Sequence, residues 1–474
     1  MSCAPLEASE DPAGSTGGWT LKLFAAAAFA ACLSPWAAHG DLFSIAWVAH
    51  HALDGRVNLY QAVIDGPARE LIGTLTYPPL TYLYFAAVMA IGRPFGLFAH
   101  AEWTFPVQLT RAECISLRLS FLPFLFLIGW TAHRLTREFV LPGDGANARR
   151  TFLLGMTSPV LLFVAFVFGQ FDLIPAAMLF LGVYLLASRR VFWGIMAVFC
   201  GVWLKNFPAL FLLIASPLLV AEYGIRRVIS PVALGIAATW GLLRAFAGPG
   251  LSASYLAFSH HEYDVVFSYA GGWMDVRATL SNVLLLGLML ASVGLAAFRN
   301  GMKLWERLLL VYVLSLIFLL APRYWMPQYM AWCAPGLVLL PALLLRLESP
   351  LVPLLYLGWN GAYLASTFIL HPNNVDSLMF RWLYHPGVPP LAARLHLSGL
   401  RSEVWTAMFV LSLLIATAIA IRLCARDWLH ARFRPVSPLP GPAQLWWATS
   451  GSVVLTAGFM AVHVLNILLA RPHH

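Results

Sequence analysis

Residues 151–187 read TFLLGMTSPVLLFVAFVFGQFDLIPAAMLFLGVYLLA, and this stretch holds two long apolar runs with a single charged residue, Asp172. The runs cover 151–168 and 172–187, so only 169–171 remain to connect them. An apolar run of about 20 residues is long enough to span the hydrocarbon of a bilayer as a helix. The stretch therefore predicts two adjacent membrane-spanning helices joined by a tight turn.

The rest of the chain has the same character. Of its 474 residues, 60% are hydrophobic and 11% are charged, whereas charged residues make up about a quarter of an ordinary soluble chain. Further apolar runs cover 19–37, 77–98, 114–133, 191–206, 207–222, 228–245, 278–297, 305–321, 327–345, 350–370, 404–423 and 447–469. We therefore predict an all-α, polytopic integral membrane protein with almost no soluble domain.

Charge and cysteine usage exclude two other classes of protein. The net charge is +9, but the basic residues are scattered in short pairs between apolar runs and form no basic face, which argues against nucleic acid as a partner. The six cysteines are dispersed and form no C-x-x-C. Neither a zinc site nor a disulfide framework is indicated.

Basic loops set the topology. Arginines and lysines recur in alternate connections from residue 134 onward, at 134–150, 189–190, 226–227, 299–307, 346 and 422–434. The positive-inside rule makes that side cytoplasmic. All these loops share one side only if 77–98 does not span. We therefore expect about 13 transmembrane helices and place 77–98 as an amphipathic or re-entrant helix on the outer face, within a long first outer loop at 38–113.

Three polar residues of the outer segments are candidates for chemistry. Asp41 follows the first span directly, where a carboxylate can act as a general base toward an acceptor hydroxyl; the alternative is a solvated acid that ends the helix. Gln170 and Asp172 lie in the tight turn described above. They either point into a cavity or form a polar hairpin tip.

Three cations are candidates for binding a phosphate. Lys205 interrupts a long apolar stretch, and a lysine there is costly in lipid unless it lines a polar cavity or pairs with an anion; snorkelling to the surface is the alternative. Arg323 precedes Tyr324 in a turn rich in rings and donors, where a guanidinium can grip a phosphate with two hydrogen bonds; an aromatic belt with one anchoring arginine is the other interpretation. Arg118 lies inside the run 114–133.

In their order along the chain, these motifs resemble the GT-C superfamily of membrane glycosyltransferases, which use polyprenyl- or dolichyl-phosphate sugars. The chain looks most like the endoplasmic-reticulum glucosyltransferases that extend lipid-linked oligosaccharides and the bacterial polyprenyl-phosphate-mannose mannosyltransferases. The motifs are Gly40-Asp41, Tyr77-Pro78-Pro79-Leu80-Thr81, Gly169-Gln170-Phe171-Asp172, Trp203-Leu204-Lys205-Asn206-Phe207-Pro208, Tyr324 and Pro327-Gln328-Tyr329. The similarity implies a cytoplasmic tail at 1–18, a catalytic transmembrane core at 19–345 and C-terminal transmembrane helices at 346–474.

The resemblance implies a function and roles for residues. It makes the chain a hexosyltransferase that moves mannose or glucose, with inversion, from a polyprenyl-phosphate donor to a lipid-linked or glycan acceptor on the outer face. Asp41 is then the base. Phosphate contacts fall to Arg323, Lys205 and Arg118, and substrate contacts to Gln170, Asp172, Tyr324, Gln328 and Tyr77. Many relatives carry two neighbouring acids in the first outer loop, but Asp41 has no acidic neighbour, so no metal ligand is assigned and a divalent cation is left open.

A transporter or flippase for a lipid-linked or anionic substrate is the alternative. Lys205 and the broken helices around it favour that function, whereas the chain shows no repeat of two halves and its outer loops are unequal in length. The sequence contains no N-x-[ST] sequon. We therefore expect a multi-pass protein of a bacterial inner membrane in preference to the endoplasmic reticulum.

Overall fold

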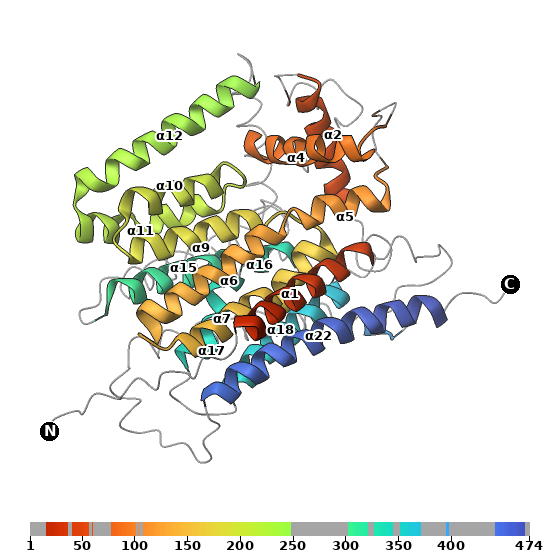
Figure 1. The fold of residues 1–474 in the computed structure, drawn as a ribbon. Coiled ribbons are helices and arrows are strands. Elements are labelled where there is room, and N and C mark those ends of the chain that lie inside the picture. Colours follow the sequence, from red (N-terminus) through yellow and green to blue (C-terminus); the bar gives the residue numbers. More distant parts are fainter. Residues whose placement is uncertain are drawn as a thin grey trace.

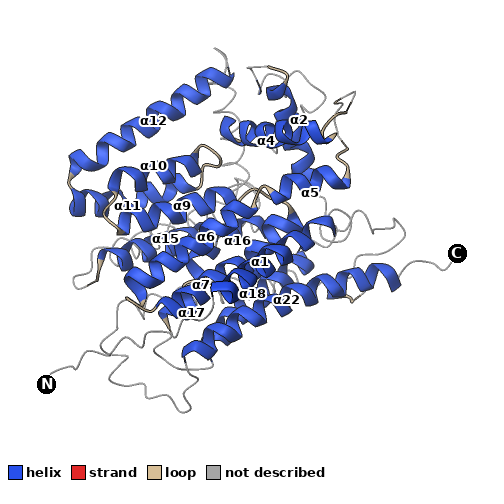
Figure 2. Ribbon diagram, in the orientation of Figure 1, coloured by secondary structure: helices blue, strands red, loops and turns tan. Residues whose placement is uncertain are grey.

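The computed structural model describes residues 16–36, 40–55, 59, 77–100, 103, 108–247, 302–320, 327–344, 351–370, 395–397 and 441–469. These residues form helices and connecting turns, with no strand among them (Figures 1 and 2). The predicted all-α class is therefore confirmed.

The described residues form helices from Thr16 to Leu469. Their bounds are α1 (Thr16–Leu33), η1 (Ser34–Trp36), α2 (Gly40–Leu53), α4 (Pro79–Gly92), η3 (Arg93–Phe95), α5 (Arg111–Leu119), α6 (Leu122–Leu135), η4 (Thr136–Val140), α7 (Gly145–Thr157), α8 (Pro159–Leu162), η5 (Phe163–Phe168), α9 (Leu173–Ala187), α10 (Val191–Val202), α11 (Pro208–Tyr223), α12 (Ile225–Ala247), α15 (Leu304–Leu320), η6 (Pro327–Tyr329), α16 (Met330–Leu337), α17 (Leu340–Leu343), α18 (Leu351–Leu370) and α22 (Gly441–Leu469).

Four helical stretches of the described chain are long and apolar enough to cross a membrane: Arg111–Val140, Gly145–Phe168, Ile225–Phe246 and Leu445–Val462. Shorter apolar helices such as Leu173–Ala187 accompany them. These helices agree with the predicted polytopic membrane fold. The expected runs 278–297 and 404–423 lie outside the described residues, so the total of about 13 spans stays a prediction.

The core is built on α9, which packs against α6, α10, α15 and α16. Close contact between helices depends on small residues, as is usual in membranes. Where α6 crosses α7, for example, a Cβ on Gly155 would lie 2.9 Å from the Cα of Gly129. A larger side chain there would force these two helices apart.

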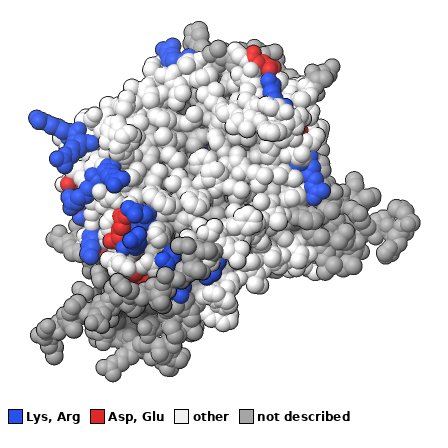
Figure 3. Space-filling view, viewed as in Figure 1, with Lys and Arg blue, Asp and Glu red and all other residues white. Residues whose placement is uncertain are grey.

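Basic residues collect at one end of the bundle. The junctions α6–α7, α9–α10 and α11–α12 and the start of α15 lie at the left of Figure 1, and Lys and Arg gather on that side in Figure 3. There Arg134 pairs with Glu138 at 2.6 Å, and Arg307 pairs with Glu222. This is the arrangement that the positive-inside rule predicts for a cytoplasmic end.

The segment 77–98 forms a short helix away from that end. α4 has 14 residues, or about 21 Å of helix, against about 30 Å of hydrocarbon. It packs against α2, and Figure 1 shows both helices at the upper right, beside the outer end of α5. α4 is therefore shorter than the hydrocarbon is thick, as are α9 with 15 residues and α10 with 12, so the placement of 77–98 as a juxtamembrane helix of the first outer loop stays a prediction.

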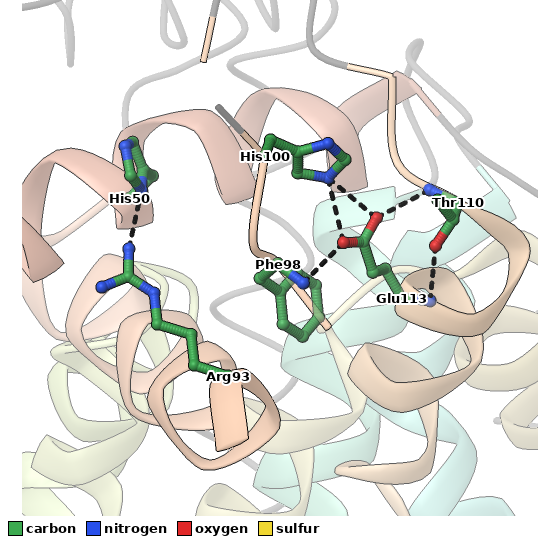
Figure 4. A network of polar contacts seen from close by, with 6 residues as sticks. All are labelled: His50, Arg93, Phe98, His100, Thr110 and Glu113. Carbon is green, nitrogen blue, oxygen red and sulfur yellow. Dashed lines mark hydrogen bonds and ion pairs between the residues drawn. The ribbon is translucent and has the colours of Figure 1, made fainter. Parts of the chain in front are cut away.

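A buried carboxylate ties α4 to α5 (Figure 4). Glu113 forms a capping box with Thr110 at the start of α5. Its Oε1 accepts the backbone N–H of Phe98 at 2.6 Å, and its Oε2 accepts that of Thr110 at 2.7 Å. His100 Nε2 lies 2.9 Å from Oε1. Glu113, only 3% exposed, thus anchors the chain that leaves α4.

A second set of contacts ties α2 to α4. Arg93 Nη2 lies 3.2 Å from His50 Nδ1 (Figure 4) and 3.8 Å from Asp54 Oδ1. The His50 ring stacks on Trp103 at 4.2 Å, and Trp47 Nε1 donates to the Trp103 carbonyl at 3.0 Å. These contacts therefore hold α2, the helix whose first turn contains Asp41, against the segment that contains α4 and Arg93.

Candidate functional site

The turn between η5 and α9 positions two of the predicted site residues. η5 is a π-helix over Phe163–Phe168 and ends at Gly169, whose φ is +78°. That left-handed conformation favours glycine. The backbone N–H of Gln170 then donates to the Val164 carbonyl at 2.9 Å. As a result Gln170 and Asp172, 1% and 0% exposed, both lie inside the protein and do not form a solvated hairpin tip.

Asp41 faces this turn. It lies in the first turn of α2, where the positive end of a helix dipole favours a carboxylate, and it is half-buried. Its Oδ2 accepts a hydrogen bond from Gln170 Nε2 across 129 positions of sequence. The acid that follows the first span is therefore directed into the protein.

Lys205 pairs with Asp172, the acid in the turn between η5 and α9. Its Nζ lies 3.0 Å from Oδ1 and 3.2 Å from Oδ2 of Asp172. Asp172 also accepts a hydrogen bond from Trp332 Nε1 on α16. The turn that carries Gln170 and Asp172 thus contacts both Asp41 and Lys205, and we call these four residues the acid–lysine cluster.

Four aromatic rings surround the Lys205 ammonium. The centroids of Tyr77, Phe171, Tyr329 and Trp332 lie 5.3, 5.5, 5.5 and 5.7 Å from Nζ. All four distances are within the range of a cation–π interaction. The rings come from separate segments of the chain and leave the Lys205 side chain 10% exposed. We call these four residues the aromatic box.

Lys205 lies in the connection between two helices, because α10 ends before it. α10 ends at Val202 and α11 begins at Pro208. A proline fits the first turn of a helix, where its missing N–H costs nothing. The Leu204 carbonyl, left without a helical partner, accepts the hydroxyl of Thr81 at 2.6 Å. This bond joins the Tyr77–Thr81 motif to the Lys205 motif.

An apolar groove adjoins the box. It lies between α4, α10 and α12, and its side chains belong to Pro78, Pro79, Val202, Trp203, Asn206, Thr239, Leu242 and Leu243. Pro78 and Asn206 are the chain neighbours of Tyr77 and Lys205. α12 presents Leu234, Ile236 and Trp240 outward. The groove therefore places an apolar wall beside a caged cation.

Arg118 lies behind the turn. It is 0% exposed, and its Nη1 donates to the Ser34 carbonyl at 2.7 Å. Its guanidinium lies directly against Gly169, because a Cβ on that glycine would come within 2.8 Å of Nε. The predicted phosphate ligand is therefore enclosed by protein and lies against the backbone of Gly169.

The remaining predictions fall near the box or outside the described residues. Gln328 is buried in η6, next to Tyr329. Arg323 and Tyr324 lie outside the described residues. Within the described ranges, no group of three or more His, Cys, Asp or Glu is placed to hold a metal ion.

Trp332 is the site residue that sequence reasoning missed. It contributes both a ring to the box and a hydrogen bond to Asp172, and its ring stacks on Phe207 at 4.1 Å. The sequence did contain a signal for Trp332. It follows the predicted site residue Gln328 by four positions, and residues four apart lie on the same face of a helix.

Comparison with known proteins finds similarity only at the level of solved structures. No protein-family model matches the chain, and no curated protein matches it in sequence. Among solved structures, the chain is similar to ArnT from Cupriavidus metallidurans bound to undecaprenyl phosphate, with 14% identity and a TM-score of 0.47, over 95% of this chain and 78% of that one.

Proposed function

We propose that this chain is an integral membrane glycosyltransferase. It transfers a hexose, mannose or glucose, from a polyprenyl-phosphate sugar to a hydroxyl of a lipid-linked or glycan acceptor on the outer face. The observation that carries the proposal is the acid–lysine cluster: one short turn pairs Gln170 with Asp41 and Asp172 with Lys205. A half-buried carboxylate and a caged ammonium therefore share one site beside an apolar groove.

The chemistry needs both groups. Asp41 takes the proton from the acceptor hydroxyl. The acceptor oxygen attacks the anomeric carbon from the face opposite the phosphate, the bond from that carbon to the phosphate oxygen breaks, and the electron pair leaves with the phosphate. The configuration at the sugar carbon is thereby inverted. Lys205 stabilises the negative charge that grows on the departing phosphate.

The surroundings of Lys205 suit a phosphate. An ammonium has three N–H donors, so Lys205 can keep its bond to Asp172 and also donate to a phosphate oxygen. The aromatic box excludes water, and charge–charge attraction is stronger in such a low dielectric. We assign Arg323 as a second phosphate contact.

The buried polar residues complete the proposed substrate site. The polyprenyl tail of the donor enters from the bilayer, and its phosphate then lies at Lys205. Sugar hydroxyls contact Gln170, Asp172, Gln328 and Tyr77, with Tyr324 as a further contact. An enzyme of this kind acts in the bacterial inner membrane.

The test is transfer by the purified full chain in lipid nanodiscs, with radiolabelled polyprenyl-phosphate mannose or glucose and a membrane glycolipid extract as acceptor. We expect Asp41→Asn to lower kcat by about 10³-fold, because a positioned general base contributes about 10²–10⁴-fold. Asp54→Asn is the matched control, since Asp54 follows α2 at its opposite end and pairs with His50. Its activity should stay within about twofold of wild type.

Two results would overturn the proposal. One is near-normal transfer by a folded Asp41→Asn variant. The other is lipid-linked substrate crossing proteoliposome membranes with no sugar transfer, which would favour the transporter or flippase. Lys205 inside a protein-lined box is compatible with either function, so the transfer assay decides between them.

A further inference from the structure

Arg118 lies between the two backbone segments that bring Asp41 and Gln170 together. It is near the end of α5 and is completely buried. Its Nη1 donates to the carbonyl of Ser34 at 2.7 Å, and Ser34 begins η1, the turn that leads from α1 toward Asp41. The same guanidinium lies against Gly169, the residue before Gln170.

Gly169 is shaped to accept this contact. A Cβ at that position would come within 2.8 Å of Arg118 Nε and 3.0 Å of Nη2. Its φ of +78° is also a conformation that side chains disfavour. The guanidinium can therefore approach the turn closely only because residue 169 has no side chain.

We infer that Arg118 is a positioning residue for the acid–lysine cluster: it holds the Ser34 and Gly169 segments at the separation at which Gln170 meets Asp41. The planar guanidinium suits this task, because it donates along its edge while its face and other edge pack against backbone. A lysine offers a single flexible point charge. The kinetic test of this inference rests on the proposed function. We assign Arg118 this positioning role in place of the direct phosphate contact expected from the sequence.

The first test is Arg118→Lys, with transfer kinetics measured on the folded full chain in nanodiscs. We expect kcat to fall by about 10²-fold, the loss that a displacement of about 1 Å can cause. The KM for the polyprenyl-phosphate sugar should change by less than about twofold, because Arg118 does not contact the donor. A purely architectural role would lower stability and leave kcat per folded molecule unchanged.

Arg111→Lys is the matched control. Arg111 lies on the same helix and donates from Nε to the Pro35 carbonyl at 2.9 Å, next along the chain to Ser34, but it is exposed. Its loss removes a similar bond to η1 without disturbing Gly169. Both kinetic constants should stay within about twofold of wild type.

Gly169→Ala approaches the same contact from the other side. The added methyl group should push the guanidinium away and lower kcat by about 10²-fold as well. The double variant with Arg118→Lys should lose less than the product of the two single losses, because both changes break one contact. If Arg118→Lys does not fold, Gly169→Ala carries the kinetic test.

Two kinetic results would overturn the inference. A donor KM raised about tenfold or more with kcat retained would make Arg118 a phosphate ligand. Constants within about twofold of wild type in both Arg118→Lys and Gly169→Ala would leave it no positioning role.

Disulfide trapping separates this inference from the proposed function. With the six native cysteines replaced by alanine, Asp41→Cys and Gln170→Cys should cross-link rapidly on oxidation. Adding Arg118→Lys should slow the cross-linking by about tenfold, since trapping depends on the separation of the two Cα atoms. A wild-type chain that transfers no hexose but shows this slowing would sink the function and keep the positioning role. Unchanged trapping would overturn the positioning role whatever the activity.

Discussion

Lys205 and Asp172 form a buried ion pair, with Nζ 3.0 Å from Oδ1 and the carboxylate 0% exposed. The two residues sit where regular helices stop, Lys205 between α10 and α11 and Asp172 ahead of α9. Each charge is tolerated only because the other is present, since a lone charge in a protein interior is costly. The pair therefore contributes both to the stability of the bundle and to the proposed sugar transfer. Variants of the two residues can separate these contributions.

The ion pair makes its own prediction. Lys205→Met leaves the Asp172 carboxylate buried without its cation, and breaking a buried pair in this way costs about 3–5 kcal/mol of unfolding free energy. Adding Asp172→Asn removes the orphaned charge and should restore most of that loss. Transfer activity should stay lost in both variants, because Lys205 is absent from both.

Thermal unfolding in detergent, with transfer assayed in parallel, checks this separation. Activity that returned together with stability in the double variant would show that Lys205 has only a structural role. A Lys205→Met variant as stable as wild type would contradict the assigned pairing.

The hydrogen bond from Trp332 to Asp172 leads to a second prediction. Trp332→Phe keeps a ring beside Phe207 and in the aromatic box but removes the indole N–H that Asp172 accepts. A hydrogen bond to a charged group contributes about 1.5–3 kcal/mol. We expect a loss of that size in the free energy of unfolding.

Trp203→Phe provides the comparison for Trp332→Phe. The Trp203 indole donates to the neutral hydroxyl of Thr239 at 2.8 Å, a bond that contributes about 1 kcal/mol. The free energy of unfolding of both variants is measured by denaturant unfolding in mixed micelles. Equal losses would mean that the hydrogen bond from Trp332 to the charged Asp172 carboxylate stabilises the protein no more than a neutral hydrogen bond does.

Much of the fold could be predicted from local pattern. The apolar runs on either side of Gly169 form two adjacent helical segments, the first made of η5 and the helices before it and the second of α9. Both could be predicted because the length of an apolar run is a property of a single stretch of sequence. The short α4 could also be predicted, because Pro79 begins it and Arg93-Pro94 follows it.

The detailed site could not be predicted from local pattern. Trp332 bonds to a carboxylate 160 positions away, and Thr81 to a carbonyl 123 positions away. No spacing rule reaches across such distances. The backbone contacts of Arg118, predicted above as a phosphate ligand, could not be read from its position for the same reason: a basic residue in an apolar run does not reveal whether it meets a ligand or the backbone of another helix.

Glu113 permits a third prediction, for the helices α2 and α4. Its two oxygens accept backbone N–H groups of Phe98 and Thr110. Glu113→Gln turns one acceptor into an NH₂ that faces a donor, and a buried donor left unsatisfied costs about 1–3 kcal/mol. Amide hydrogen exchange should therefore speed up in α4 and in the neighbouring α2.

Glu138→Gln is the reference for Glu113→Gln. Glu138 pairs with Arg134 at the end of the bundle where basic residues collect, and its side chain is 30% exposed. Pairs near the surface contribute about 0–1 kcal/mol, so exchange in α4 should not change. Equal protection of α4 in both variants would show that Glu113 does not hold this helix.

The bond between Thr81 and Leu204 supports the last prediction, because it joins the segment of Tyr77 to the segment of Lys205. Thr81→Val preserves shape and removes the hydroxyl, which leaves the buried carbonyl unsatisfied at a cost of about 1–3 kcal/mol. One wall of the aromatic box should then loosen around Lys205.

Since Lys205 is the proposed phosphate contact both in the bound donor and in the transition state, the donor KM of Thr81→Val should rise about tenfold and kcat should fall as well. This kinetic signature differs from the one expected for Arg118→Lys, in which the donor KM is kept. Thr151→Val is the control, because the Thr151 hydroxyl bonds to the Asn147 carbonyl within its own helix at 2.9 Å and joins no second segment. A donor KM and a kcat both within about twofold of wild type in Thr81→Val would show that this bond does not hold Lys205 at the phosphate.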